Sequence, residues 1–125
     1  MELNQYQTLA MRTDSSYKNS KDRLLNGLMG LNGEAGEAID VAKKHLFQGH
    51  ELDYDLLAEE IGDVLWYCAL CADAMDISLD DIAEMNIAKL KKRYPDGFSE
   101  DKSINRLKDA VIEELKPDYR EHCFA

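Results

Sequence analysis

The chain has 125 residues, of which 45% are hydrophobic, so it is long enough for one compact domain with a core of its own. Its formal net charge is −10, from 25 acidic and 15 basic side chains, which argues against binding duplex DNA or an anionic membrane through a broad electrostatic surface. The first twenty residues are polar, no stretch has eighteen consecutive apolar residues, and the three cysteines are an odd number for a disulfide framework. We therefore expect a single-domain cytoplasmic protein that binds neither a nucleic acid polymer nor a membrane.

Apolar residues recur at helical spacing in five segments, and no segment alternates with the period of a strand. The predicted helices cover about 3–13, 23–48, 54–75, 78–94 and 103–115, the second of them with a start signal at Ser20 or Asp22. Gly49 suits the left-handed position after the second helix, Ser78 suits the N-cap of the fourth, and Pro95 ends the fourth. The pattern predicts an all-α fold, most simply a helical bundle, with a core at 22–98 and a C-terminal helix and tail at 99–125.

The segment GLMGLNGEAG at 27–36 has a glycine at every third position, yet the apolar period continues through it. A phosphate-binding loop is disfavoured, because no strand precedes the segment and no Gly-Lys-Ser/Thr follows it. On a helical wheel Gly27 and Gly30 share a face with two glutamates, so we expect them to leave an open cleft for a ligand. Gly33 and Gly36 point elsewhere, where they would let a neighbouring helix approach closely.

Two pairs of carboxylates, Glu34 with Glu37 and Glu60 with Asp63, are spaced three residues apart on consecutive predicted helices. Neighbouring negative charges repel each other and are costly near a core unless a cation binds between them. Two such pairs on adjacent antiparallel helices would form a set of four oxygen donors, which in the absence of histidine favours Mg²⁺ or Mn²⁺. For either pair alone, the alternative is an ordinary solvated acidic face.

The order Glu34-Ala-Gly-Glu37, then 22 intervening residues, then Glu60-Ile-Gly-Asp63 resembles the EXXE–EXXD signature of MazG-like nucleotide pyrophosphohydrolases. The wider stretches GLNGEAGEAIDVAKK, LAEEIGDVLWY and NIAKLKKRYPDGF are similar to three helices of the same family, and the match covers about 24–98. The resemblance implies a four-helix-bundle-like, all-α NTP pyrophosphatase fold with extra terminal helices.

The same resemblance implies a Mg²⁺-dependent hydrolase, with Mn²⁺ as a substitute, that converts a nucleoside triphosphate to the monophosphate and pyrophosphate. The substrate in this family is commonly a deoxynucleotide or a non-standard nucleotide. The metal ions would activate a water for attack on the α-phosphate and neutralise the triphosphate. The catalytic and metal-binding residues implied are Glu34, Glu37, Glu60 and Asp63, one of which would serve as general base.

Substrate-binding residues are implied on two further segments. Asn86, Lys89 and Arg93 resemble the family's phosphate-binding positions, and two cations one turn apart suit a polyphosphate. Their alternative is a solvated basic face, because other lysines lie in the same segment. Tyr67 is placed to stack on a base or ribose, or else belongs to the core beside Trp66.

The family often pairs its subunits, so we expect a homodimer or homotetramer. The proposed interface residues are Leu25, Met29 and Phe47, and the candidates for base recognition on the first helix are Tyr6, Gln7 and Arg12. One alternative function is a non-catalytic helical module that binds nucleotide or metal, which the presence of all four carboxylates argues against. The other is a phosphoribosyl-ATP pyrophosphatase-type enzyme, with related chemistry and a different substrate.

Overall fold

The computed structural model describes residues 1–15 and 19–106, which form five helices and no strand. In chain order these are α1 (Leu3–Met11), α2 (Ser20–Gln48), α3 (Tyr54–Ala74), α4 (Leu79–Arg93) and α5 (Glu100–Ile104). The predicted all-α class is confirmed, and the first four predicted helices differ from the observed ones only at their ends. None of the helices in the described ranges is both long and apolar enough to cross a bilayer.

The helix ends follow local capping chemistry. The side chain of Asn19 accepts a hydrogen bond from the Asp22 amide at 3.0 Å, so α2 begins at Ser20. Ser78 caps α4 in the same way, as predicted, and Gly49 ends α2 with a φ of 74°, in the left-handed region that favours glycine.

The fifth helix differs from the prediction of a helix over 103–115. It begins at Glu100 because the Ser99 hydroxyl accepts a hydrogen bond from the Lys102 amide at 3.3 Å, and it ends before Asn105. The remainder of the predicted helix, at 107–115, and the tail after it lie outside the described residues.

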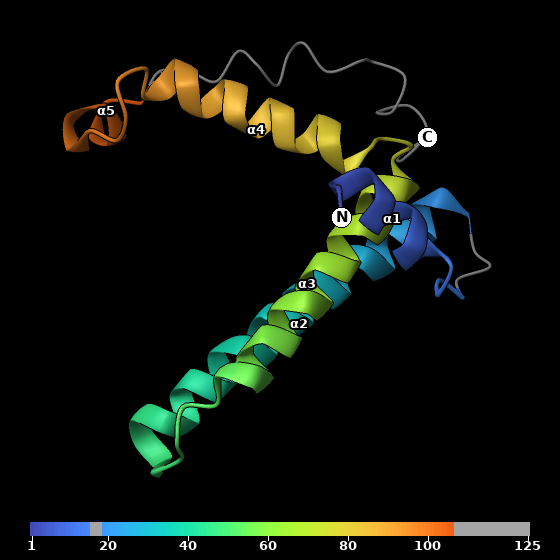
Figure 1. The fold of residues 1–125 in the computed structure, drawn as a ribbon, viewed down its shortest axis with the longest axis vertical. Helices are drawn as coiled ribbons and strands as arrows, with labels where there is room; N and C mark the ends of the chain where they lie inside the picture. The colour runs from blue at the N-terminus through green and yellow to red at the C-terminus, as the bar shows by residue number, and fades with distance from the viewer. Residues whose placement is uncertain (16–18, 107–125) are drawn as a thin grey trace.

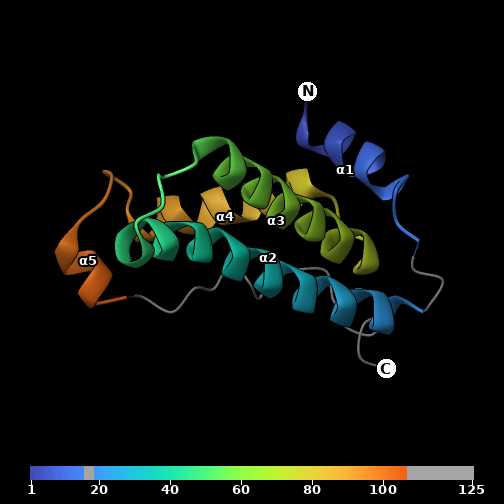
Figure 2. The same ribbon diagram turned by 90° about the horizontal axis from the view of Figure 1, so that it is seen from below.

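The long helices α2 and α3 form an antiparallel hairpin, and α4 leaves the end of α3 in a different direction (Figure 1). Together they have the outline of a V, with α1 at its vertex, where α3 ends and α4 begins. The view from below shows α2 and α3 side by side along their length, with α1 beside the end of α3 (Figure 2). Within the described part of the chain, α2 and α3 are therefore packed along their lengths, whereas α1 and α4 meet them only near the vertex.

The hydrophobic core of the described residues lies at this vertex. Its buried members are Ala10, Leu24, Ala69, Leu70, Cys71, Ala72, Ala74 and Leu79. They come from α1, the beginning of α2, the end of α3 and the first residue of α4. The other end of the hairpin contributes none of them, so the vertex is where burial of apolar surface stabilises the fold.

Polar contacts close the vertex on its outer side. The indole N–H of Trp66 on α3 donates a hydrogen bond to the Thr13 hydroxyl at 2.8 Å, which ties the end of α1 to α3. The Arg23 guanidinium lies 2.9 Å from an Asp14 oxygen and 2.6 Å from an Asp73 oxygen. Because Arg23 and Asp14 are largely shielded from solvent, this network holds the start of α2 between the α1–α2 connection and the end of α3.

Candidate metal centre

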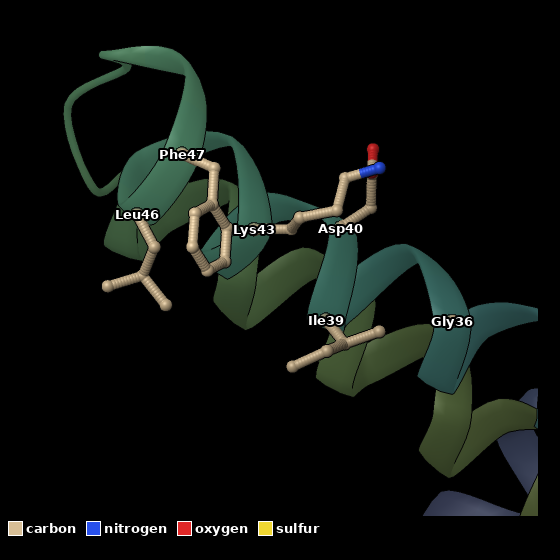
Figure 3. A pocket seen from close by; sticks show the side chains of 6 residues that line it. All are labelled: Gly36, Ile39, Asp40, Lys43, Leu46 and Phe47. Carbon is tan, nitrogen blue, oxygen red and sulfur yellow. The ribbon is translucent and has the colours of Figure 1, made fainter.

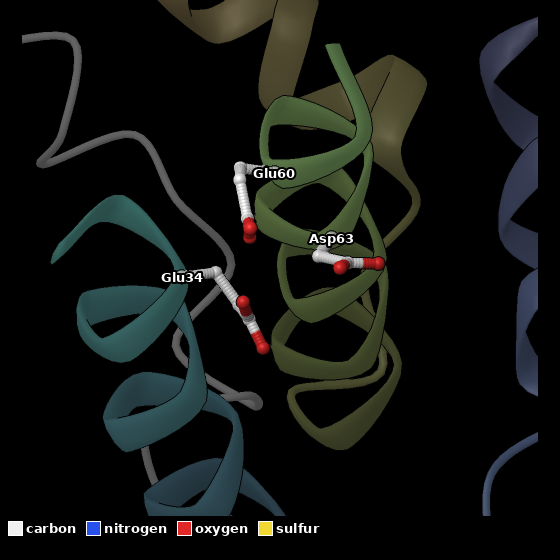
Figure 4. Close-up of side chains that lie close together, drawn as sticks. All are labelled: Glu34, Glu60 and Asp63. Carbon is white, nitrogen blue, oxygen red and sulfur yellow. The ribbon is translucent and has the colours of Figure 1, made fainter. Parts of the chain in front are cut away.

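Three carboxylates meet between α2 and α3. Glu34 on α2 and Glu60 and Asp63 on α3 each offer an oxygen atom, and these atoms all lie within 4.8 Å of one another. Figure 4 shows the Glu34 side chain directed at α3 and the Glu60 side chain directed back towards it, with Asp63 one turn along. Glu34 and Glu60 are half-buried, and Asp63 is exposed. We call this group the carboxylate triad.

The register of the hairpin brings the triad together. Facing residues step one turn at a time in opposite directions along the two helices. The facing pairs are Gly27 with Cys71, Gly30 with Tyr67, and Glu34 with Asp63. The face of α2 that carries Glu34 is thus the face that contacts α3.

This register overturns the prediction that Gly27 and Gly30 leave an open cleft. A Cβ atom on Gly27 would lie 2.6 Å from the Cys71 sulfur, and a Cβ atom on Gly30 would overlap the Tyr67 ring. Both glycines therefore allow α3 to pack closely on α2. The helical wheel placed them correctly on the face of Glu34, but near the vertex that face is covered by α3.

Gly33 and Gly36 were predicted to let a neighbouring helix approach closely, and no helix of the described chain does so. No described atom lies within 4 Å of the position that a Cβ would take on either residue. Within the described part of one chain, this side of α2 faces open space.

The triad is electrostatically strained. The pKa of Glu60 is raised above its ordinary value, first because part of its solvent is lost and then because of the negative charges of Glu34, Glu37 and Asp63. A hydrogen bond with Glu34 adds to the same shift. Crowded carboxylate oxygens without a histidine among them are the ligands that a hard divalent cation such as Mg²⁺ or Mn²⁺ prefers, so these residues fit such an ion.

Glu37, the fourth predicted ligand, lies outside the triad. It is exposed on α2, although its charge still acts on Glu60. The same carboxylate raises the pKa of Lys44, after the larger effect of Asp40, whose oxygen lies 2.8 Å from the Lys44 ammonium. Sequence analysis missed Lys44 as a cation near this site, although its four-residue spacing from Asp40 was the available signal.

Aromatic side chains flank the triad on the side of the vertex. The half-buried Tyr67 packs on Gly30 and makes an edge-to-face contact with Trp66, with ring centroids 5.0 Å apart. Tyr6 of α1 is also half-buried, and its pKa is raised by burial and then by the charge of Asp63, which places α1 at the border of the site.

The other two candidates on α1 lie differently. The side-chain amide of Gln7 is hydrogen-bonded to the turn between α3 and α4, with its N–H donated to the Ile77 carbonyl at 3.0 Å and its oxygen accepting from the Leu79 amide at 2.7 Å. Both polar groups of the Gln7 side chain are therefore used in hydrogen bonds within the chain, which disfavours the prediction that it recognises a base. Arg12 is exposed at the C-terminal end of α1.

The predicted phosphate-binding residues all lie on α4. Asn86 is exposed, and Lys89 and Arg93 are half-buried. Because α4 diverges from the hairpin (Figure 1), its middle does not lie along the carboxylate triad of the same chain. The structure thus brings together three of the four carboxylates and leaves the cations of α4 on a separate arm.

A shallow apolar groove of about 380 Å³ lies on α2 (Figure 3). Its lining residues are Gly36, Ile39, Asp40, Lys43, Leu46 and Phe47. Gly36 and Lys43 are about half a turn around the helix from Glu34, so the groove lies on the back of α2 and takes no part in the triad.

Comparison with known proteins gives two matches. The family model of the MazG nucleotide pyrophosphohydrolase domain matches residues 23–98, which include all four predicted metal ligands. The Gene 37 protein of Mycobacterium phage L5 is 37% identical over 82 residues, which cover 62% of this chain and 72% of that protein. No solved structure was found to match the chain.

Proposed function

The chain belongs to the MazG nucleotide pyrophosphohydrolase family, and from that premise we propose that it hydrolyses a nucleoside triphosphate to the monophosphate and pyrophosphate with Mg²⁺. The observation that supports this proposal most strongly is the carboxylate triad, whose oxygen atoms lie within 4.8 Å of one another. A cation between the carboxylates would relieve their mutual repulsion and compensate the charge of a triphosphate.

The four carboxylates divide into two roles in this proposal. Glu34, Glu60 and Asp63 would hold Mg²⁺, which when bound acidifies water and neutralises phosphate oxygens. Glu37 lies beside the triad without belonging to it and is exposed to solvent. It is therefore the carboxylate available to accept a proton from the attacking water as general base. The attack on the α-phosphorus breaks its bond to the bridging oxygen, and pyrophosphate leaves.

Substrate contacts are assigned to both arms of the V. Tyr67 would stack on the base or ribose beside the triad. Asn86, Lys89 and Arg93 would bind phosphate oxygens, for which Arg offers paired N–H donors and Lys a point charge. Because α4 diverges from the hairpin of its own chain, we propose that these cations act in an assembly of more than one copy.

The proposed assembly is a homodimer or homotetramer that covers the back of α2. Met29 is 73% exposed and Phe47 is 80% exposed, and Leu25 is also exposed on this helix. The open sides of Gly33 and Gly36 would let a helix of a second copy approach. We expect sedimentation to show a dimer or tetramer that Met29→Glu with Phe47→Glu dissociates, whereas Tyr54→Glu, at an exposed aromatic residue outside this face, should not. A monomer at every concentration tested would rule out the assembly.

The activity is tested with a panel of canonical and modified nucleoside triphosphates, and with phosphoribosyl-ATP, in the presence of Mg²⁺ or Mn²⁺. We expect pyrophosphate as the product, and a loss of activity on the order of 100-fold or more for Asp63→Asn or Glu37→Gln in proteins that still fold. Glu59→Gln, at an exposed glutamate next to Glu60, is the matched control and should keep its activity. Release of orthophosphate, or full activity in the two variants, would contradict the proposal, and nucleotide binding without turnover would favour a non-catalytic module.

A further inference from the structure

Two side chains of α1 hydrogen-bond to the beginning of α4. The Gln7 side-chain oxygen accepts from the Leu79 amide at 2.7 Å, and its N–H donates to the Ile77 carbonyl at 3.0 Å. The Asn4 side-chain oxygen accepts from the Asp80 amide at 3.1 Å. These bonds join residues more than 70 positions apart, except for the Ile77 bond, which spans 70.

These bonds satisfy backbone groups that the helix itself cannot satisfy. The first amides of an α-helix have no carbonyl partner within the helix and need one from elsewhere. The Ser78 hydroxyl accepts a hydrogen bond from the Asp81 amide of α4, while side chains of α1 accept hydrogen bonds from the amides of Leu79 and Asp80. Since Leu79 is buried, water is a poor substitute for the Gln7 oxygen, and the loss of that bond would leave a buried donor unpaired.

The direction of α4 depends on a small contact region. Figure 1 shows that, among the described residues, α4 meets α1 and the end of α3 near the vertex and then projects away from the hairpin, with α5 at its far end. The turn before it contains Asp76 in the left-handed region, with a φ of 55°. Among the described residues, α4 packs at its beginning, where Leu79 and Ile82 join the core, so its orientation depends on this apolar contact, on the turn and on the bonds from α1.

We propose that Asn4 and Gln7 are positioning residues that fix the direction of α4 and thereby place Lys89 and Arg93 on the phosphates of the substrate. The second half of this inference rests on the proposed function, in which those two cations bind phosphate. Positioning residues of this kind act without touching the substrate, and a displacement of about 1 Å at the reacting groups can cost on the order of 100-fold in rate.

Gln7→Leu tests the proposal by removing both hydrogen bonds while keeping a side chain of similar size. We expect amide hydrogen exchange at Leu79 to become at least about tenfold faster, because its amide loses the Gln7 acceptor, whereas the Asp80 amide keeps Asn4. The KM for the nucleoside triphosphate should rise about tenfold, with a smaller change in kcat, as contacts to the phosphates are lost. The affinity for Mn²⁺ alone should stay within about twofold, because the triad lies on α2 and α3 and not on α4.

Two further variants separate positioning from stability. Thr13→Val removes one of the two acceptors of the Trp66 indole N–H, the Thr13 hydroxyl just after α1, and leaves the Ala10 carbonyl and the contacts of α4 in place, so it should lower the melting temperature without raising KM. Asn4→Asp keeps an oxygen acceptor for the Asp80 amide and should behave like the wild type, whereas Asn4→Ala should raise KM.

The outcomes distinguish this proposal from the proposed function. Unchanged amide exchange in Gln7→Leu, or an equal rise in KM in Thr13→Val, overturns the positioning role. So does a normal KM in Gln7→Leu when Lys89→Ala raises it. Faster exchange with a normal KM in both Gln7→Leu and Lys89→Ala supports the control of α4 by α1 and overturns phosphate binding by α4, which belongs to the proposed function.

Discussion

The facing positions of α2 and α3 near the vertex and those in the middle of the two helices share one register but hold different side chains. Near the vertex, Gly27 and Gly30 let Cys71 and Tyr67 pack against the backbone of α2, and buried residues gather around them. One turn further along, the same facing positions hold Glu34 and its partners on α3, which repel one another. Tight packing near the vertex thus holds together charges in the middle of the hairpin that would otherwise separate the helices.

The sharpest test of this packing exchanges for alanine one glycine on the face of α2 that contacts α3 and one on its back. Gly30→Ala should destabilise the protein by about 1–3 kcal/mol, because the added methyl group overlaps the Tyr67 ring and the helices must shift. In the dissociated Met29→Glu, Phe47→Glu background, Gly36→Ala should stabilise the chain by up to about 1 kcal/mol, because alanine has the higher helix propensity and its Cβ meets no described atom outside its own helix. Urea unfolding of both variants measures the two free energies.

Activity gives this pair of variants a second readout. A shift of α2 against α3 at Gly30 would also move Glu34 relative to Asp63, so Gly30→Ala should lose activity together with stability. Equal stability changes at the two glycines would show that the two faces of α2 do not differ in packing.

A smaller effect on stability is expected from pH and from metal at the carboxylate triad. The pKa of Glu60 is raised in the folded protein above its ordinary value of 4.5. The unfolded chain therefore releases this proton first as pH rises, and the contribution of Glu60 to stability is present below about pH 4.5 and lost as pH rises through the folded pKa. In metal-free protein, Glu60→Gln should raise the melting temperature by a few degrees at neutral pH and have no such effect below that range.

Adding Mg²⁺ or Mn²⁺ at neutral pH completes this test. The ion should raise the melting temperature of the wild type, because it binds the folded triad and not the unfolded chain, and Glu60→Gln should respond less. Chelation should reverse the change. A melting temperature that is indifferent to metal in the wild type would mean that the triad is an ordinary acidic surface.

Sequence periodicity predicted the helices well because each long helix carries its own apolar stripe and its own caps, such as Ser78 and Gly49. It also placed Gly27, Gly30 and Glu34 on one face of α2. It could not say what covers that face at each turn, because the answer depends on where α3 crosses α2, and the predicted cleft at Gly27 and Gly30 is therefore wrong.

The direction of α4 was harder to predict for a related reason. The spacing of apolar residues along α4 shows which of its faces is apolar, but it does not determine the angle at which α4 leaves α3. That angle depends on a left-handed residue, Asp76, and on hydrogen bonds from Asn4 and Gln7. Nothing in the sequence indicates that polar residues of a short helix such as α1 accept hydrogen bonds from the start of α4. The prediction for Gln7 is base recognition instead.

The long sequence separation of the contacts made by α1 also bears on the order of folding. The hairpin of α2 and α3 joins neighbouring segments and can form as soon as both have been synthesised. By contrast, α1 has only 9 residues, too few for a stable helix in water by itself. Its partners Trp66, Ile77 and Asp80 leave the ribosome much later. Although α1 precedes the hairpin in the chain, it can be anchored only after α3 has been synthesised.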